Sequence, residues 1–98
     1  MDINQAMRSA VLTGKTIIGR KRSFKAIGKE DIKLFILASN FPEDKKKVIE
    51  ESRIPYYVYK GTNVEMGYAC GKTFPISLLA VIDPGNSNIL DLRKETNG

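Results

Sequence analysis

Leu34-Phe35-Ile36-Leu37-Ala38 is an uninterrupted run of five apolar residues near the middle of this 98-residue chain. A run of this kind, without alternation of polar and apolar residues, is typical of a β-strand that is covered on both faces. Residues 78–82 form a second apolar run, and residues 15–18 and 56–59 are shorter strand candidates. The sequence therefore predicts a sheet whose central strands are buried by helices on both sides.

Helical patterns fall between these strand candidates. Residues 2–13 repeat apolar side chains at three- and four-residue spacing, with Asp2 placed to cap the helix and Gly14 placed to end it. A second helix is predicted for residues 20–27, with Gly28 at its end. The first third of the chain therefore contains two helices on either side of one short strand.

Two further helices are predicted in the second half of the chain. Pro42 suits the first turn of a helix in which Val48 and Ile49 face the core. The string Thr62-Asn63-Val64-Glu65 has the pattern of a capping box and opens a helix that Gly71 ends. Because helices alternate with strands, the fold class is α/β, with a parallel or mixed sheet and helices on both faces. Residues 88–90 are expected to add an edge strand.

The loops of such a sheet are the first place to look for a site. Ligands of α/β sheets gather at the loops that follow the ends of the strands. Here those loops begin at Gly19, Asn40, Gly61 and Lys72. We therefore expect the functional residues in these four loops.

Basic residues are concentrated in the first third of the chain. Seven lie between Asp2 and Glu30 with no acidic residue among them, and the rest of the chain carries nine basic residues against eleven acidic ones. The net charge of +5 is therefore a local feature. A basic patch on an otherwise balanced small domain indicates a polyanionic partner, most often nucleic acid. The alternative is a solvated lysine-rich face.

The composition excludes several function classes. The chain has no histidine and one cysteine, Cys70, so a zinc site of the usual ligands and Ser-His-Asp or Cys-His catalysis cannot be built. A lone cysteine forms no internal disulfide, as is usual in a reducing cytosol. No apolar stretch is long enough to span a membrane, and the N-terminus lacks a signal-peptide pattern. We therefore expect no enzyme activity, cofactor, metal or membrane partner.

The loop at Gly19 leads directly into a basic cluster of Arg20, Lys21 and Arg22. Glycine lets a ligand approach the backbone closely, and the helix start that follows offers free amides to a phosphate. The spacing from Gly14 to Gly19 is superficially like a phosphate loop, but the Gly-Lys-Ser/Thr ending is missing, so nucleotide hydrolysis is not expected. The alternative is a plain turn between a strand and a helix.

Polar side chains occupy two of the other loops. Asn40 follows the central strand, where its amide can donate to and accept from a base edge; the alternative is a turn former before Pro42. Asn63, at the opening of the fourth helix, is expected to project outward. Glu65 is either occupied by helix capping or accepts a hydrogen bond from a guanine edge.

The loop of residues 72–76 contains apolar side chains, Phe74 and Ile76, beside the stiffening Pro75. Apolar side chains on a loop either stack on an unpaired base or fill the core. Cys70, just before this loop, is expected to be a small helix-packing residue.

Five strings stand in this order along the chain: Thr13-Gly14-Lys15 with Gly19, residues 33–40, Gly61-Thr62-Asn63-x-Glu65-x-Gly67, Ala69-Cys70-Gly71-Lys72-x-Phe74 and Asp83-Pro84-Gly85-x-Ser87-x-Ile89-Leu90. Each string is short. Taken together, over residues 3–92, they resemble the family of large-subunit ribosomal protein thirty-e of archaea and eukaryotes, within the kink-turn RNA-binding superfamily.

The resemblance implies a three-layer α/β/α sandwich with a mixed four- to five-stranded sheet. It also implies RNA contacts by the residues that match the family's binding surface: Ile18, Gly19, Lys21, Asn40, Asn63, Glu65, Phe74 and Ile76. Arg20 and Arg22 are expected to contribute to the same surface. The chain departs from the family pattern at Pro75, where a basic residue is common in eukaryotic members. The resemblance therefore does not carry that one phosphate contact over to this chain, whereas the stacking expected of Phe74 is unaffected.

The implied function is that of a structural component of the large ribosomal subunit that binds a kink-turn-like internal loop of ribosomal RNA. We expect a single RNA-binding domain over residues 1–98, with an ordered core over 3–92. It would be a monomer outside the cytoplasmic ribosome, would contact neighbouring ribosomal proteins, and would have no small-molecule substrate. The short N-terminus is typical of archaeal members.

Three alternatives remain open at the level of the sequence. A sister member of the superfamily, serving a small ribonucleoprotein, would share the fold and the RNA motif. An enzyme acting on nucleotides or RNA would need carboxylates converging near Gly19, whereas the acids in the first half are scattered. A protein-interaction module would bind an acidic partner through the same basic patch.

Overall fold

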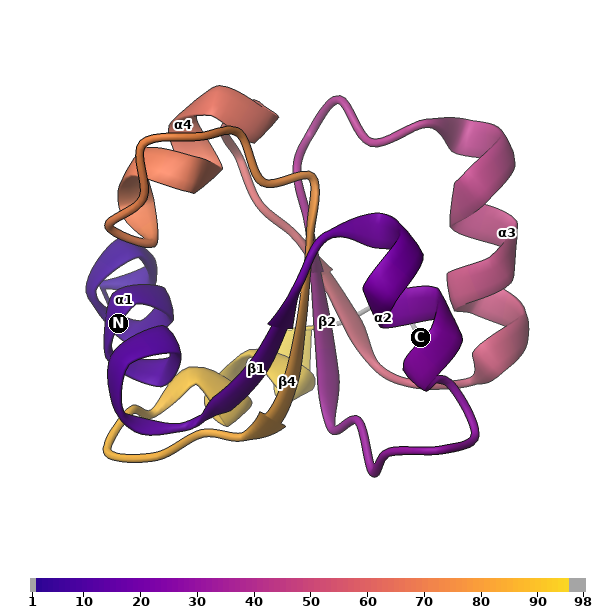
Figure 1. Ribbon diagram of the computed structural model, residues 1–98, viewed down its shortest axis with the longest axis horizontal. Coiled ribbons are helices and arrows are strands. Elements are labelled where there is room, and N and C mark those ends of the chain that lie inside the picture. The colour runs from indigo at the N-terminus through magenta and orange to yellow at the C-terminus, as the bar shows by residue number, and fades with distance from the viewer. Residues whose placement is uncertain (1, 96–98) are drawn as a thin grey trace.

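The computed structural model describes residues 2–95 of the chain. Its centre is a four-stranded sheet with the strand order β1-β4-β2-β3 (Figure 1). The strands are β1 (Lys15–Ile18), β2 (Leu34–Leu37), β3 (Tyr56–Val58) and β4 (Leu78–Asp83). β4 runs antiparallel to both β1 and β2, whereas β2 and β3 are parallel. Strands β1, β2 and β3 therefore point the same way, and β4 points the opposite way.

Helices cover both faces of this sheet (Figure 1). They are α1 (Ile3–Thr13), α2 (Arg20–Ala26), α3 (Glu43–Ser52), α4 (Asn63–Ala69) and the 3₁₀ helix η1 (Ile89–Glu95). Buried side chains of α1, α4 and η1 pack on one face, and those of α2 and α3 pack on the other. The predicted three-layer α/β/α arrangement with a mixed sheet is confirmed. Among the described residues, no helix is both long and apolar enough to cross a lipid bilayer.

The apolar run that opened the sequence forms the middle of the core. All four residues of β2 are buried, and its neighbour β4 is buried from Leu78 to Val81. Leu34 and Ile36 belong to the cluster beneath α1 and α4, whereas Phe35 and Leu37 belong to the cluster beneath α2 and α3. This alternation follows from the strand period of two and requires apolar residues at every position of β2.

The helix boundaries follow the predicted caps. The Oδ1 atom of Asp2 accepts a hydrogen bond from the Gln5 amide at 3.1 Å and begins α1. The Thr62 and Glu65 side chains form both bonds of a capping box at the start of α4. Beyond the end of α4, Gly71 has a positive φ of 81°, a conformation that favours glycine. The capping prediction is therefore confirmed at three helix ends.

Two local predictions were wrong. Residues 88–90 do not form an edge strand, because η1 begins at Ile89. In a 3₁₀ helix, residues three apart lie on the same side, so Ile89 and Leu92 are both buried against the sheet. In α3, Ile49 is fully buried, but the Val48 side chain is 39% exposed, because one residue along a helix turns the side chain by about 100° away from the core.

Candidate nucleic-acid interface

Four loops meet at one edge of the sheet. Because β4 is reversed, its start lies beside the ends of β1, β2 and β3. Backbone hydrogen bonds join the loops in series: Gly19 N–H to the Leu78 carbonyl at 3.0 Å, Ala38 N–H to Ser77 at 3.0 Å, and Ser39 N–H to Gly61 at 2.9 Å. We call residues 18–22, 39–40, 61–65 and 72–77 the four-loop edge. The four loops in which the sequence places the functional residues therefore lie at one end of the sheet.

The β1–α2 loop presents three basic side chains at this edge. Gly19 has φ +106°, which L side chains rarely adopt, and its carbonyl accepts the hydrogen bond from the Ser23 amide that begins α2. Lys21 and Arg22 are exposed, and Arg20 is half-buried. None of the three takes part in either of the ion pairs found among the described residues. Their charges are therefore available to an external anion.

Ile18, the last residue of β1, is half-buried and packs against the core cluster beneath α1 and α4. Its backbone leads directly into the Gly19 loop. Only part of its side chain can reach a ligand, so its contribution to the edge is an apolar contact beside the basic cluster.

Asn40 and Asn63 hold each other across the four-loop edge. The Asn40 Nδ2 atom donates to Asn63 Oδ1 at 3.0 Å, and the Asn63 backbone amide donates to Asn40 Oδ1 at 3.0 Å. Asn63 Oδ1 also accepts from the Val64 amide at 3.0 Å. The expectation that the Asn63 side chain projects freely was wrong, because it is part of this pair. The pair fixes the orientation of Asn40, which stays exposed.

Glu65 is engaged in helix capping. Its Oε1 atom accepts from the Thr62 amide at 3.0 Å and from the Thr62 hydroxyl at 3.2 Å. No hydrogen bond is found for its Oε2 atom in the described part of the chain. The residue is exposed, so capping leaves one carboxylate oxygen for a ligand.

The two apolar residues of the loop before β4 have opposite environments. Phe74 is 49% exposed, whereas Ile76 is 1% exposed and belongs to the core cluster beneath α1 and α4. The Ile76 backbone amide donates to the Asn63 carbonyl at 3.0 Å, which ties the loop to the start of α4. The prediction that Ile76 stacks on a nucleotide is therefore corrected: its side chain anchors the loop that presents Phe74.

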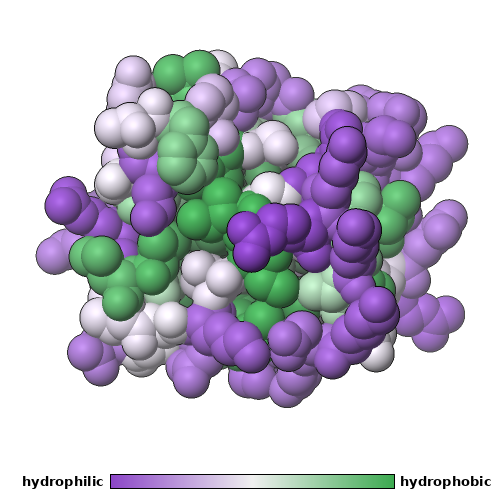
Figure 2. Space-filling view, viewed as in Figure 1, coloured by the Kyte–Doolittle hydropathy of each residue, from purple (hydrophilic) through white to green (hydrophobic). Residues whose placement is uncertain are grey.

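The basic segment is divided by the fold. Arg20, Lys21 and Arg22 lie at the four-loop edge, but Lys15, at the start of β1, lies at the other end of the sheet and pairs with Glu30 at 3.5 Å. Arg8 of α1 lies beside Gly71, at the base of the Phe74 loop. In Figure 2, hydrophilic residues dominate the surface over α2 and α3, and more hydrophobic surface is seen over α1 and α4.

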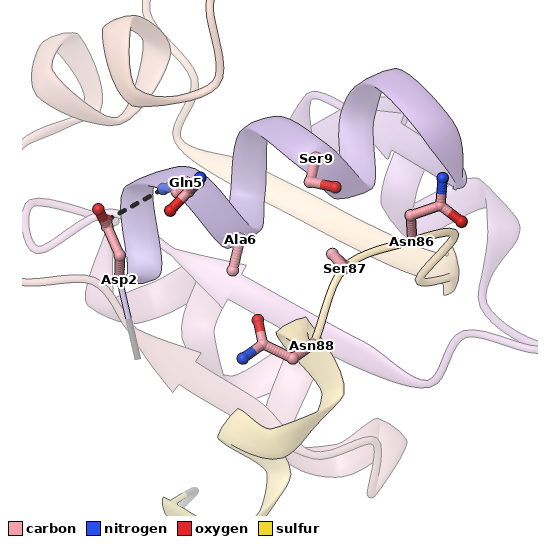
Figure 3. Close-up of a pocket in the computed structure, with 7 residues that line it drawn as sticks. All are labelled: Asp2, Gln5, Ala6, Ser9, Asn86, Ser87 and Asn88. Atoms are coloured by element: carbon pink, nitrogen blue, oxygen red, sulfur yellow. Dashed lines mark hydrogen bonds between the residues drawn. The ribbon is translucent and has the colours of Figure 1, made fainter.

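A shallow pocket of about 260 Å³ lies away from the four-loop edge, between α1 and the loop after β4 (Figure 3). Amide and hydroxyl side chains line it, together with one carboxylate, and its lining contains no basic residue: Asp2, Gln5, Ala6, Ser9, Asn86, Ser87 and Asn88. The lining offers no positive charge to a phosphate backbone. This pocket is therefore not part of the candidate nucleic-acid interface.

Two ionisable side chains near α4 have shifted pKa values. Burial raises the pKa of the Cys70 thiol to about 11, although nearby Lys72 acts in the opposite direction. Burial also raises the pKa of Tyr59, whose hydroxyl donates to Asn4 Oδ1 at 2.6 Å. Cys70 is buried, as expected for a helix-packing residue, and its thiol is neutral at physiological pH.

Comparison with known proteins gives the same family as the motifs. The model of the ribosomal protein L7Ae/L30e/S12e/Gadd45 family matches residues 1–91. The chain belongs to this family. A member from Methanocaldococcus jannaschii, named large ribosomal subunit protein eL30, is 45% identical over 102 residues, which cover 100% of this chain and 93% of that protein. The protein of the same name from Methanothermobacter thermautotrophicus is 45% identical over 96 residues, which cover 94% and 98% of the two chains.

One solved structure has a similar overall fold. A protein of unknown function from Bacillus halodurans superimposes with a TM-score of 0.78 over 96% of this chain and 97% of the other. The sequence identity is 23%, so this likeness concerns the fold alone. The four-stranded mixed sheet with helices on both faces is therefore an architecture that also occurs in a distantly similar sequence.

Proposed function

We propose that this protein is a structural component of the large ribosomal subunit and binds a kink-turn-like internal loop of ribosomal RNA through the four-loop edge. The observation that carries the proposal is the meeting, at one hydrogen-bonded edge, of a basic cluster, an oriented amide and an exposed aromatic ring. Each of these groups suits a different part of an internal loop. The names of the archaeal relatives support the ribosomal setting.

The basic cluster acts on phosphates. Arg20, Lys21 and Arg22 follow Gly19 at the start of α2 and form no ion pair among the described residues. Phosphate contacts supply affinity and position the RNA but carry no sequence information. These three residues therefore set the strength of binding and its dependence on salt.

Asn40 acts on a base edge. Its pairing with Asn63 uses one Nδ2 hydrogen and one lone pair of Oδ1. An amide side chain has two donor hydrogens and two acceptor lone pairs, so one donor and one acceptor of Asn40 remain for a base. Because Asn63 holds the amide in one orientation, Asn40 can discriminate between bases without first being ordered. Asn63 acts as the positioning residue for this contact.

Phe74 acts as the stacking platform. Its ring is on the surface in a loop held by the buried Ile76 on one side and by Gly67 of α4 on the other. Unpaired bases of RNA internal loops stack on such aromatic rings. Glu65, through its Oε2 atom, and Ile18, through its exposed part, complete the proposed surface.

The finer parts of the proposal concern partners and assembly. The protein is a single RNA-binding domain that is a monomer outside the ribosome, works in the cytoplasmic ribosome beside other ribosomal proteins and takes no small-molecule substrate. The curated relatives carry ribosomal names, which favours this function over a role in another small ribonucleoprotein or in catalysis.

Cross-linking to RNA tests the proposal. The purified protein is mixed with total ribosomal RNA, irradiated, and the bound fragments are sequenced. The expected result is one enriched fragment that folds as an internal loop with unpaired purines, and enrichment that falls for Lys21→Ala and Phe74→Ala. Gln5→Ala, which changes an exposed residue outside the four-loop edge, is the control. Enrichment spread evenly over the RNA, or equal in all variants, contradicts the proposal.

A further inference from the structure

A second pocket, of about 280 Å³, opens beside the four-loop edge between the start of α1, the end of β3 and the start of α4. Tyr57, Tyr59, Lys60, Gly61 and Glu65 line it together with Asn4. Pockets for drug-sized ligands have volumes of about 300–1,000 Å³, so this pocket suits a smaller group. We propose that it binds a single unpaired guanine base.

The walls of the pocket are fixed by specific contacts. The Tyr59 hydroxyl donates to Asn4 Oδ1 at 2.6 Å and so joins the residue that follows β3 to α1 across the pocket. A Cβ atom on Gly61 would lie 2.7 Å from the Tyr59 ring and 3.1 Å from Glu65 Cβ. Gly61 therefore allows the ring and the carboxylate to approach each other, and any larger residue there would push them apart.

The chemistry of the lining matches a nucleobase. The two half-buried tyrosine rings offer surfaces on which a planar base can stack. Around them are a donor amide on Asn4, whose oxygen is already taken by Tyr59, an ammonium on Lys60 and the free Oε2 atom of Glu65. A stacking surface with polar groups at its rim suits a base, whereas an aliphatic ligand would leave those polar groups without partners.

Guanine fits the distribution of donors and acceptors best. Its pairing edge carries N–H donors, which suit the Glu65 carboxylate, beside the O6 acceptor, which suits the Asn4 amide or Lys60. The base of cytosine or uracil offers a smaller surface for stacking between the tyrosines. Adenine has no carbonyl oxygen for the two donor groups. The pocket therefore discriminates through Glu65 and Asn4 together.

The base can come from the bound RNA or from a free nucleotide. The pocket shares Gly61 and Glu65 with the four-loop edge, so an unpaired guanine adjacent to the internal loop can enter it while Asn40 and Phe74 hold the loop. Entry of a guanine from the bound RNA rests on the proposed function. A free guanine nucleotide presents the same base and is distinguished from it by experiment.

The first experiment titrates the whole protein with guanosine 5′-monophosphate and follows backbone and side-chain amide signals by NMR. The expected result is saturable shifts at Asn4 and Gly61, with an affinity about fivefold or more above that of cytidine 5′-monophosphate. Glu65→Gln is the informative variant, because glutamine also completes a capping box but replaces a carboxylate oxygen by a donor group. It should remove the preference for guanosine without lowering the melting temperature.

The second experiment measures the affinity of the cross-linked internal-loop RNA for Asn4→Ala, Glu65→Gln and the control Gln5→Ala. A loss of RNA affinity of about threefold or more in Asn4→Ala and Glu65→Gln, with no loss in Gln5→Ala, assigns the source of the guanine to RNA. Nucleotide shifts at Asn4 and Gly61 without any change in RNA affinity assign the source to free nucleotide. No shifts at the pocket together with unchanged RNA affinity overturn the inference.

The same variants separate this inference from the proposed function. If Lys21→Ala and Phe74→Ala weaken RNA binding but Asn4→Ala, which lies in the pocket and outside the four-loop edge, does not, the proposed function is supported and the pocket does not bind RNA. If the protein enriches no internal-loop RNA but gives the nucleotide shifts, the proposed function fails and the guanine pocket stands.

Discussion

Gly67, in the middle of α4, lies directly beneath the backbone carbonyl of Phe74. A Cβ atom at Gly67 would overlap the Phe74 carbonyl oxygen and would lie 3.0 Å from the Phe74 carbonyl carbon. The loop that presents the exposed ring therefore rests on the helix backbone itself. Glycine is a poor helix former, but the buried position 67 needs one because of this close approach.

Gly67→Ala should therefore act on RNA binding through the loop. In an unhindered helix, replacing glycine by alanine stabilises the protein by about 0.5–1 kcal/mol. Here the Phe74 loop must move to admit the methyl group, so we expect a lower melting temperature and weaker RNA binding. The RNA affinities of Gly67→Ala, Phe74→Ala and the double variant measure how strongly the two positions are coupled in RNA binding. If the losses of RNA affinity from the two changes simply add, Gly67 does not position Phe74.

Phe74→Ala and Ile76→Ala form a matched pair within one loop. Phe74→Ala should leave the melting temperature nearly unchanged and lower RNA affinity by about one to two orders of magnitude, because a stacked base contributes about 1–3 kcal/mol. Ile76→Ala should lower the free energy of unfolding by about 2–5 kcal/mol, because it opens a cavity in the core. Thermal melts and RNA-binding titrations on both variants test these two roles. A large loss of stability in Phe74→Ala with unchanged affinity would place its ring in the core.

Lys21→Ala and Asn40→Ala should separate affinity from specificity. We expect Lys21→Ala to weaken binding to all RNAs alike, because the role proposed for its ammonium is a contact with phosphate, which carries no sequence information. Asn40→Ala should weaken the matched RNA preferentially, by roughly 1–3 kcal/mol relative to a scrambled one. Titrations against both RNAs measure the difference. Equal losses on matched and scrambled RNA in the two variants would show that these roles are wrongly assigned.

The dependence of binding on salt should follow the basic cluster. Neutralising phosphates releases counterions, so the logarithm of the affinity should fall linearly with the logarithm of the salt concentration. Lys21→Ala should reduce this slope by about one unit, whereas Lys15→Ala, at the other end of the sheet, should leave it unchanged. Filter binding at several salt concentrations gives both slopes. A flat response in the wild-type protein rules out phosphate contacts as the source of affinity.

Cys70 predicts how stability depends on alkaline pH. The thiol has a pKa of 9.0 when unperturbed and about 11 in the folded protein, so the folded state holds its proton to higher pH than the unfolded state. Its contribution to stability is complete below about pH 9 and is lost as the pH rises toward about 11. Tyr59, whose pKa is also raised, acts in the same direction. Denaturant unfolding measures the free energy of unfolding at about pH 8 and about pH 10. Between these two pH values, this free energy should fall less for Cys70→Ala than for the wild-type chain.

The features that sequence alone predicted were those with a local physical cause. The buried run of β2 has no polar position, and the caps at Asp2, Thr62 and Gly71 depend on residues a few positions apart. Such signals are complete within one segment. They identified the helices, the central strands and the loops that form the four-loop edge.

The features that sequence missed depend on contacts between distant segments. Nothing near Asn63 indicates that its side chain meets Asn40, 23 residues away. Phe74 and Ile76 are both apolar residues of one loop, and only the packing of that loop against α4 and the sheet separates the exposed ring from the buried one. A strand was predicted at residues 88–90, but the structure has a 3₁₀ helix from Ile89. That difference likewise depends on the surface that Ile89 and Leu92 cover.

The reversed direction of β4 has a consequence for the energetics of recognition. The hydrogen bonds that align the four loops are extensions of the sheet ladders, from Gly19 to Leu78 and from Ala38 to Ser77. The shape of the edge is thus formed during folding, and little conformational entropy of the protein remains to be lost when RNA arrives. On the proposed function, the RNA would be the partner that changes shape, and the protein would act as a rigid template for a flexible internal loop.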